Sequence, residues 1–541
     1  MHKDTVKRNI FLMGVFIYFI ACTTLFLEGL GLETNEAFEP LYALQMLHRN
    51  TQVNFPYTLM VSPYEGHFIS YPLLYLFALF GPSVFISRCI FVFFSLISLI
   101  SIFYVIKRWF KEEVALLTIF LLGINLNFIR AARVGGLRDE IIQIALVWSA
   151  IALVQLYIDR KQKIYLYASA FILGLALWAK IVFVDLFLAS LVTFIAFGRK
   201  GPNFTKNNIP TTKKDLAVFF LMFMAGASPF IIFNLTCQEN TLRHLWHAFS
   251  SPTIYGYNNL AYFRNLSLRV DDLFQFLSYR NAPEMLFGVT VNNYFHIFLF
   301  FVSLFGIMSY VLFSKRQHLS KNKLLFLIST CTIIFFLLPF VPQQPCVEHL
   351  FILFPFIQII EATFIFLIPL FVKNTIMPMA LIICMLLPHV SLEFYNARRF
   401  LGEIKNGGGT LYFSPIIKDI ANYAERQGIK KLFAMSEYLL ALNIDFLTDL
   451  KVEVRELYEV YPYDGMPLSA DAVMDSIYKR EMEPLRQIYV IVRRDGHLSD
   501  SAQEAFEVLT KIALEQGRER VLLKKFSGKG GAPLFELYVI K

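Results

Sequence analysis

Repeated apolar runs constrain this chain more than any other feature of its sequence. A helix needs about 17–25 mainly apolar residues to cross the ~30 Å hydrocarbon core of a bilayer. Eleven runs approach or reach that length, near 10–29, 83–106, 114–129, 140–158, 164–180, 181–197, 216–235, 291–313, 324–342, 350–371 and 375–390. Hydrophobic residues make up 56% of the 541 residues and charged residues only 17%, which a soluble enzyme of this size could not bury. We therefore predict an all-α polytopic membrane domain of about eleven transmembrane helices.

The distribution of Lys and Arg predicts the orientation of these spans. If the N-terminus is cytoplasmic, the inside segments hold nineteen Lys and Arg residues and the outside segments before residue 391 hold nine. Short basic loops stay on the cytoplasmic side. We predict a multi-pass plasma (inner) membrane protein with a cytoplasmic N-terminus. After eleven spans, its C-terminal domain is extracytoplasmic.

The formal net charge of +9 does not indicate a nucleic-acid partner. Residues 391–541 contain 21 Lys and Arg and 22 Asp and Glu, so the excess positive charge lies in the membrane part. The cytoplasmic loops account for it. Membrane lipids are therefore expected partners, and no nucleic acid is predicted.

From about residue 400 the hydrophobic pattern changes to that of a small α/β domain. Ser414 and Pro415 indicate a helix start, and Gly428 indicates its end. The strands KLFAM, VEVREL, QIYVIV, VLLKKF and LFELYVI alternate with helices expected at 437–448, 469–482 and 500–516. We predict a membrane domain at 1–390 and a soluble extracytoplasmic α/β domain at 391–541, the second an accessory domain for acceptor docking.

The first outer segment, about 31–82, carries two groups of polar residues. GLETNEAFEPLYALQML places Glu33, Glu36 and Glu39 before an amphipathic pattern typical of a helix on the membrane surface. YEGHFISYPLLYLFALFG then places Glu65 and His67 before an apolar run. No cofactor is required by this pattern. A divalent cation at Glu65 and His67 stays open, because two ligands are too few to define a metal site.

The second outer loop, RAARVGGLRD at 130–139, places three arginines beside Asp139. Guanidinium groups suit phosphate oxygens, so the loop is a candidate phosphate site next to a carboxylate base. Alternatively, it is a solvated turn whose arginines pair with lipid head groups.

Two later segments are also candidates for the site. The third outer loop, 236–290, alternates aromatic residues with Arg, Asp and Asn. It either covers the site as a lid or binds the acceptor, or it is a structural loop without such a function. QQPCVEHLFILFPF places His349 at the start of a span, where a histidine is either a satisfied interfacial residue or a functional one.

These features in this order resemble the lipid-linked sugar transferases of the GT-C fold, and most of all the aminoarabinose transferase and protein O-mannosyltransferase group. The resemblance covers about residues 10–390. It rests on NEAFEPLYALQML in the first outer loop, LRDEIIQIAL in the second, a Gly-rich span ending in Lys at GLALWAK, and EHLFILFPF in a late span.

The resemblance implies a site at the outer face. The position of the family's leading Asp is occupied here by Asn35, which has no carboxylate. Glu36 therefore becomes the best candidate for the catalytic carboxylate in the first loop, and Glu33 is the second choice. Asp139 of the second loop ranks equal to Glu36. A lysine of the family is absent from HFISYPLL, where His67 is the nearest candidate. The predicted catalytic residues are Glu36, Asp139 and Glu33, and the predicted donor phosphate-binding residues are Arg133, Arg138, Lys180 and His349.

Two functions from different classes fit the sequence. The first is a glycosyltransferase that moves a hexosyl or pentosyl group from a polyprenyl-phosphate donor to a lipid, glycan or protein acceptor on the outer (periplasmic) face. The second is a transporter or flippase of a lipid-linked substrate, which predicts charges near the bilayer midplane. Most charges lie at outer span ends, and Asp185 and Glu361 are the exceptions.

Overall fold

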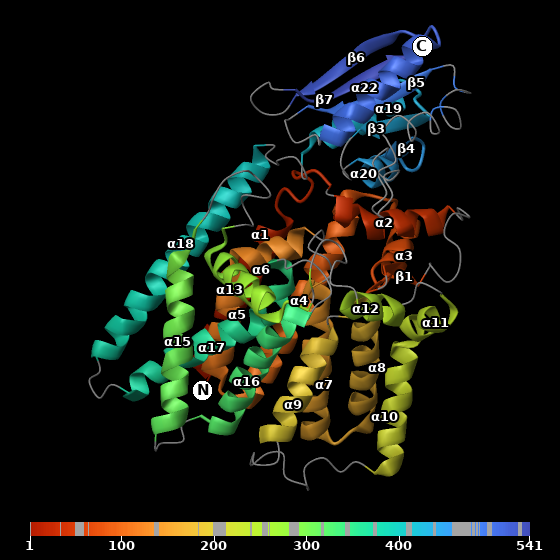
Figure 1. The fold of residues 1–541 in the computed structure, drawn as a ribbon. Helices are drawn as coiled ribbons and strands as arrows, with labels where there is room; N and C mark the ends of the chain where they lie inside the picture. The colour runs from red at the N-terminus through yellow and green to blue at the C-terminus, as the bar shows by residue number, and fades with distance from the viewer. Residues whose placement is uncertain are drawn as a thin grey trace.

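The computed structural model shows a helical membrane part with a small sheet domain beyond one end of it (Figure 1). The N-terminus lies at the opposite end from that domain, and the C-terminus lies within it. The structure describes residues 2–32, 34–48, 59–62, 64–134, 140–181, 183–197, 212–237, 241–250, 258, 260–280, 292–314, 319–340, 347–371, 376–406, 414–435, 440–456, 478, 482, 485, 487–494, 500–527 and 533–541.

The membrane part is almost entirely helical. Its described elements are, in chain order, α1 (His2–Thr24), α2 (Thr34–Leu47), β1 (Met60–Ser62), β2 (Glu65–Gly66), α3 (Ser70–Phe80), α4 (Val84–Trp109), α5 (Glu112–Ile124), α6 (Leu126–Arg133), α7 (Glu140–Arg160), α8 (Lys163–Ala179), α9 (Phe183–Phe197), α10 (Lys213–Gly226), α11 (Ser228–Thr236), α12 (Thr241–Ser250), α13 (Tyr262–Ser278), α15 (Tyr294–Phe313), α16 (Lys321–Leu337), η3 (Leu338–Phe340), η4 (Val347–Leu353), α17 (Phe354–Phe371) and α18 (Ile376–Lys405).

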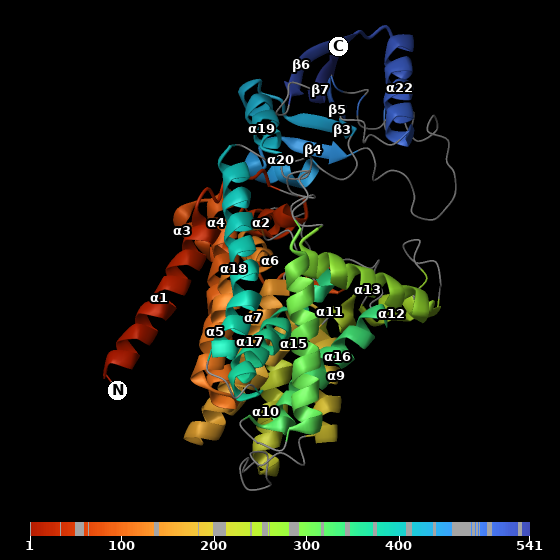
Figure 2. The same cartoon turned by 90° about the vertical axis from the view of Figure 1, so that its left-hand side faces the viewer.

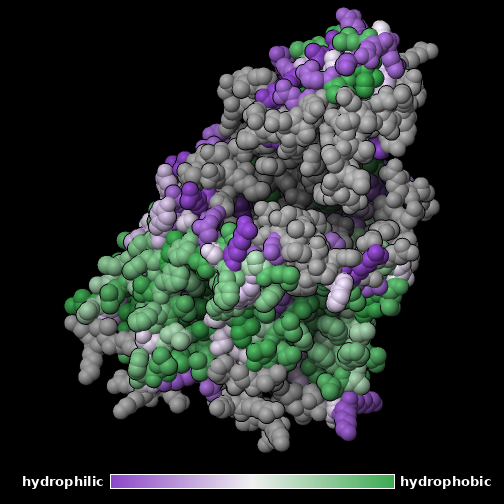
Figure 3. All heavy atoms as spheres, in the orientation of Figure 1, coloured by the Kyte–Doolittle hydropathy of each residue, from purple (hydrophilic) through white to green (hydrophobic). Residues whose placement is uncertain are grey.

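Among the described residues, seven helices are long and apolar enough to cross a membrane, or up to nine if each of two bent pairs is one span. The eleven predicted runs all fall on helices, but the count of eleven spans is not confirmed. The runs at 164–180 and 181–197 fall on α8 and α9, whose apolar helices are shorter than a full span. Hydrophobic residues cover the lower part of the molecule in Figure 3, as a multi-pass membrane protein requires.

Both bent pairs have a local cause in the sequence. α5 and α6 meet at 63°, and between them the side chain of Asn125 accepts hydrogen bonds from the backbone N–H groups of Asn127 and Phe128. α10 and α11 meet at 64°, where Pro229 occupies the start of α11. An asparagine cap and a proline each favour a new helix start over a continuous helix.

The helix α2 was expected on the membrane surface, and the structure places it differently. Ala37, Leu41 and Leu44 are buried in the main core. They face protein rather than lipid, because α2 packs on α3 and on α20 (Ala441–Leu447) of the C-terminal domain. The ring of Phe446 on α20 lies 5.9 Å from that of Phe77 on α3.

The helix α18 continues well beyond the predicted last span. It runs through Pro388 to Lys405 and connects the membrane part with the sheet domain (Figure 2). The predicted domain boundary at residue 390 therefore falls inside it. The residues after Pro388 are more polar, yet Glu393, Asn396 and Phe400 are buried against the protein, and these contacts explain why the helix continues.

The C-terminal domain is an α/β unit, as predicted. Its elements are α19 (Ile416–Arg426), β3 (Lys431–Met435), α20, β4 (Glu453–Glu456), β5 (Ile488–Arg493), α22 (Asp500–Glu515), β6 (Arg520–Ser527) and β7 (Pro533–Ile540). The strand order is β4-β3-β5-β7-β6, with β4, β3 and β5 parallel and β7 antiparallel to both neighbours. Leu432 and Ala434 face the core on one side of the sheet, and Phe433 and Met435 the core on the other. The helix expected at 469–482 lies almost wholly outside the described residues.

The helices α8 and α10 pack closely through two glycines. A Cβ atom on Gly174 would lie 2.2 Å from the carbonyl oxygen of Phe223, and one on Gly226 would lie 2.1 Å from that of Phe171. Small residues at such a contact allow two membrane helices to approach each other closely. The Gly-rich span that ends at Lys180 is therefore fixed by backbone contact.

We expect Gly174→Ala to destabilise the protein, because overpacking typically costs about 1–3 kcal/mol. The matched control is Gly14→Ala on α1, where no heavy atom lies within 4 Å of the added Cβ and alanine favours the helix. Thermal unfolding of the purified protein in detergent measures both. Equal midpoints for the two variants would contradict the close contact.

Candidate functional site

The predicted Lys180 lies at the end of α8 and is buried. Its Nζ donates to Oε1 of Glu140 at 2.6 Å, and Glu140 is the first residue of α7. The amide of Gln143 on α7 donates to the Lys180 carbonyl oxygen at 2.7 Å. A charge pair and a backbone contact thus hold the end of α8 against the start of α7.

The first outer segment packs on the same point. Glu65 on β2 forms an isolated antiparallel bridge with Lys180, and the N–H of Ile181 donates to the Tyr64 carbonyl oxygen at 2.9 Å. A Cβ atom on Gly66 would lie 2.3 Å from the carbonyl oxygen of Trp178, so only glycine fits there. The first outer segment therefore meets the end of α8 at Lys180.

The second outer loop reaches this point through the chain itself. Arg138 and Asp139 lie outside the described residues, and so does Glu33. Arg138 and Asp139 directly precede Glu140, whose carboxylate binds Lys180. The ion pair at Lys180 therefore fixes the start of α7, which follows these two residues in the sequence.

Glu36 is placed in a buried ion pair. Its two carboxylate oxygens accept hydrogen bonds from Arg88 on α4, from Nε at 2.6 Å and from Nη2 at 2.8 Å. Arg88 also donates to the carbonyl oxygens of Leu27, Leu30 and Gly31. Both oxygens of this buried carboxylate are therefore engaged by one guanidinium group. The pair fixes the start of α2 against the turn after α1.

Arg133 makes similar contacts from α6. Its guanidinium donates to the carbonyl oxygen of Cys22 at 2.6 Å and to that of Phe26 at 3.0 Å. These carbonyl groups belong to the end of α1 and the turn that follows, which lack partners within a helix. The contacts describe a side chain that stabilises the end of α1, and phosphate binding by Arg133 stays a prediction.

His67 lies in a buried polar group between α2 and α3. Its Nδ1 lies 3.2 Å from Ser70 Oγ and 3.5 Å from Glu39 Oε2, and its ring packs against that of Tyr42 at a tilt of 51°, with centroids 4.0 Å apart. Within the described part of the chain, no three His, Cys, Asp or Glu side chains form a group that could hold a metal ion. The described side chains thus add no third ligand to Glu65 and His67.

His349 lies on η4 and contacts Arg269, for which the sequence predicted no role. Nη2 of Arg269, on α13, lies 3.1 Å from Nδ1 of His349, and both side chains are buried. Arg269 Nη1 also lies 3.4 Å from Asp272. Arg269 lies in the amphipathic segment YFRNLSLRVDDLFQFLS. Its place on the apolar side of that helix is the feature of the sequence that could have predicted a buried, functional arginine.

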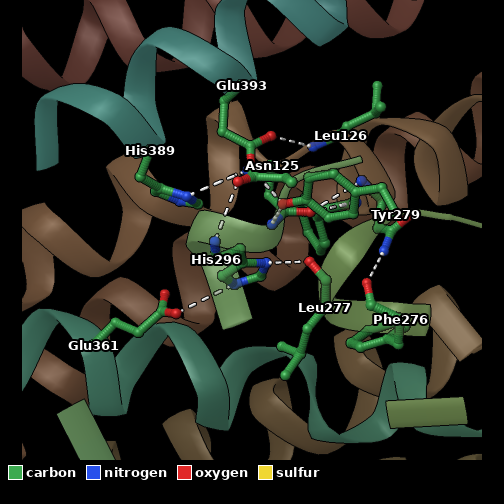
Figure 4. Close-up of polar contacts among 12 residues, drawn as sticks. Asn125, Leu126, Phe276, Leu277, Tyr279, His296, Glu361, His389 and Glu393 are labelled. Atoms are coloured by element: carbon green, nitrogen blue, oxygen red, sulfur yellow. Dashed lines mark hydrogen bonds and ion pairs between the residues drawn. The ribbon is translucent and has the colours of Figure 1, made fainter. Parts of the chain in front are cut away.

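A second buried polar cluster was not predicted at all (Figure 4). It joins Glu393 and His389 on α18, Tyr279 after α13, His296 on α15, Glu361 on α17, and Asn125 between α5 and α6. His296 Nε2 lies 3.2 Å from Glu361 Oε1. Apart from His389 and Glu393, which lie one turn apart on α18, these residues come from segments far apart in the sequence, so no local pattern predicts the cluster.

Sequence comparison relates part of the chain to one family. The model of the family described as dolichyl-phosphate-mannose-protein mannosyltransferase matches residues 66–232, which include Glu140 and Lys180. No curated protein sequence matches the chain significantly.

Solved structures match almost the whole chain. The structure of ArnT from Cupriavidus metallidurans bound to undecaprenyl phosphate has a TM-score of 0.61 at 12% identity, over 98% of this chain and 97% of that chain. Its apo state has a TM-score of 0.58 at 12% identity, over 99% and 98%. The oligosaccharyltransferase of Archaeoglobus fulgidus in complex with Zn and sulfate has a TM-score of 0.50 at 12% identity, over 89% and 68%.

The chain therefore has the GT-C fold of membrane glycosyltransferases, which confirms the resemblance inferred from its sequence. Residues 66–232 carry the sequence pattern of the dolichyl-phosphate-mannose-protein mannosyltransferase model.

We expect the Glu36–Arg88 pair to stabilise the fold strongly. Removing one partner of a buried ion pair typically costs about 3–5 kcal/mol, because the other charge is left unpaired. Glu36→Gln and Arg88→Met should each lower the thermal midpoint, and the double variant should lower it by less than the sum. Additive effects across this cycle would mean that the two side chains do not depend on each other.

Proposed function

We propose that this protein is a membrane glycosyltransferase that moves a hexosyl or pentosyl group from a polyprenyl-phosphate donor to a lipid, glycan or protein acceptor on the outer (periplasmic) face. The GT-C fold supports the class of reaction. The similarity to a structure that binds undecaprenyl phosphate supports the class of donor. The observation that carries the proposal is the buried Lys180–Glu140 pair, because it joins the outer segments whose residue types suit this reaction.

The chemistry needs one base and one stabilised leaving group. The acceptor hydroxyl oxygen attacks the anomeric carbon of the sugar while the bond from that carbon to the phosphate oxygen breaks. The base takes the hydroxyl proton, and the polyprenyl phosphate leaves with the bonding electron pair. Cations near the phosphate stabilise its growing charge, most effectively where water is excluded.

We assign the base to a carboxylate of the first or second outer loop: Asp139, Glu36 or Glu33. Glu36 is buried and both of its oxygens accept hydrogen bonds from Arg88, so an acceptor hydroxyl group has little access to it, which favours Asp139 between those two. For the donor phosphate, Lys180 is supported by its burial and by its pairing with the residue that follows Asp139. Arg138, Arg133 and His349 complete the proposed phosphate-binding set.

The proposed orientation puts the N-terminus in the cytoplasm and the C-terminal domain outside. The N-terminus and the C-terminal domain lie at opposite ends of the helical part (Figure 1), which supports opposite sides of the membrane. The short basic connections on the N-terminal side support a cytoplasmic assignment. The plasma (inner) membrane is the proposed location.

A direct assay tests the function. Purified protein in detergent is incubated with radiolabelled polyprenyl-phosphate sugars and with lipid, glycan or peptide acceptors, and product formation is measured. Labelled acceptor that requires the protein supports the proposal. The absence of product from every donor, by protein that remains folded, would refute it.

We expect Lys180→Met to weaken binding of undecaprenyl phosphate and to slow transfer, because the phosphate loses a cation. Glu140→Gln is the matched control: it removes the same ion pair but keeps the lysine charge. It should leave donor affinity unchanged or increase it. If both variants lose affinity equally, the ion pair has a structural role and Lys180 is not a phosphate ligand.

We expect Asp139→Asn to slow transfer by about 10²–10⁴-fold, the usual cost of losing a general base. Donor binding and the thermal midpoint should stay near those of the unaltered protein. Glu36→Gln, in contrast, should lower the thermal midpoint through the loss of its pair with Arg88. Near-normal transfer by Asp139→Asn would exclude Asp139 as the base.

The second candidate function is transport of a lipid-linked substrate, and the His296–Glu361 pair favours it. Both side chains are buried within predicted spans, and ionisable groups at such depth often mark transport pathways. Reconstituted vesicles separate the two functions. A transporter moves labelled polyprenyl-phosphate sugar between leaflets without making product, whereas the proposed enzyme makes product when an acceptor is present.

A further inference from the structure

We infer that Glu393 is a positioning residue of the donor site: it fixes the junction of α6 and α13, and so the place of the His349–Arg269 pair. The inference rests on the proposed function. Glu393 is fully buried on α18, in the part of that helix that the sequence pattern assigns to the soluble domain.

Both carboxylate oxygens of Glu393 are used, and each binds a different element (Figure 4). Oε2 accepts a hydrogen bond from the backbone N–H of Leu126, the first residue of α6, at 3.1 Å. Oε1 accepts one from Nδ2 of Asn293 at 3.0 Å and one from the hydroxyl group of Tyr279. One side chain of α18 therefore holds the starts of α6 and α15 and the end of α13.

The bend between α5 and α6 explains why a carboxylate is used here. A new helix start leaves backbone N–H groups without partners, and water is scarce inside a membrane protein. Asn125 Oδ1 accepts from the N–H groups of Asn127 and Phe128, and Glu393 accepts from that of Leu126.

The end of α13 is held at three nearby points. Nδ2 of Asn127 on α6 donates to the Phe276 carbonyl oxygen at 2.9 Å, and Nδ1 of His296 lies 3.0 Å from the Leu277 carbonyl oxygen. The hydroxyl group of Tyr279 donates to Glu393 and lies 2.5 Å from Nδ2 of Asn125.

The same junction reaches the proposed phosphate ligand. The ring of Phe276 packs against those of Phe351 on η4 and Phe354 on α17, both at 5.2 Å. α13 carries Arg269 and η4 carries His349, and these two side chains touch. A shift of α13 or of α6 would therefore move both groups, and an error of about 1 Å in such positioning can cost about 100-fold in rate.

The test compares two carboxylate-to-amide substitutions on α18. Glu393→Gln keeps the shape of the side chain and replaces one acceptor oxygen by an NH2 group, and Glu403→Gln makes the same change further along the helix, at a half-buried position. Binding of undecaprenyl phosphate to the purified full-length protein is measured well below the thermal midpoint of each variant. The donor KM and kcat are measured by the transfer assay.

We expect Glu393→Gln to bind undecaprenyl phosphate about 10–100-fold more weakly, with the donor KM raised more than kcat is lowered. Glu403→Gln should match the unaltered protein. Tyr279→Phe removes only the hydroxyl donor and should weaken binding in the same direction by less. It supplies the test if Glu393→Gln does not fold.

Two results would overturn the inference, and they are distinguishable. The first result is that the unaltered protein binds undecaprenyl phosphate and that both variants, Glu393→Gln and Tyr279→Phe, bind it with the same affinity. Glu393 would then have a structural role only, whether or not the variants unfold at a lower temperature. If the unaltered protein itself does not bind undecaprenyl phosphate, the proposed donor is wrong, and the inference is lost with it.

Discussion

Charge neutralisation inside a dry helical bundle is the constraint on which the rest of the structure depends. An unpaired charge or a free backbone group is costly where water is scarce, so buried ionisable side chains must meet partners from other elements. Glu36 meets Arg88, and Lys180 meets Glu140. Glu393 meets the start of α6. These contacts lie where helices begin, end or bend, since that is where the chain leaves backbone groups without partners.

The same contacts give the proposed site its rigidity. Lys180 is held by Glu140 and by the bridge to Glu65, so the end of α8, the start of α7 and the first outer segment form one unit. The position of the Arg269–His349 pair likewise depends on α13, which carries Arg269 and is held at its end. Cations placed in advance can stabilise a departing phosphate without reorganising during the reaction, and such pre-organisation suits the proposed sugar transfer.

Much of the fold could be predicted, because each helix or strand leaves a local pattern. KLFAM predicted β3 at its observed bounds, and the last two apolar runs of the domain became β6 and β7. All eleven apolar runs likewise predicted helices, because hydropathy is also a local pattern. The bend at Asn125 and the continuation of α18 were missed, because hydropathy does not report an asparagine cap or a helix held by buried polar contacts.

The sequence by itself determined the class of protein, its helices, its α/β domain and the segments rich in basic and carboxylate side chains, because periodicity and residue type are local properties. Only the tertiary structure decided what those side chains contact. It paired Glu36 with Arg88 and brought Arg133 to the end of α1, and it brought Glu393 to α6 across 267 positions of sequence separation. Partners so distant in the chain are chosen by packing and by the need to satisfy buried polar groups, and no local pattern encodes that choice.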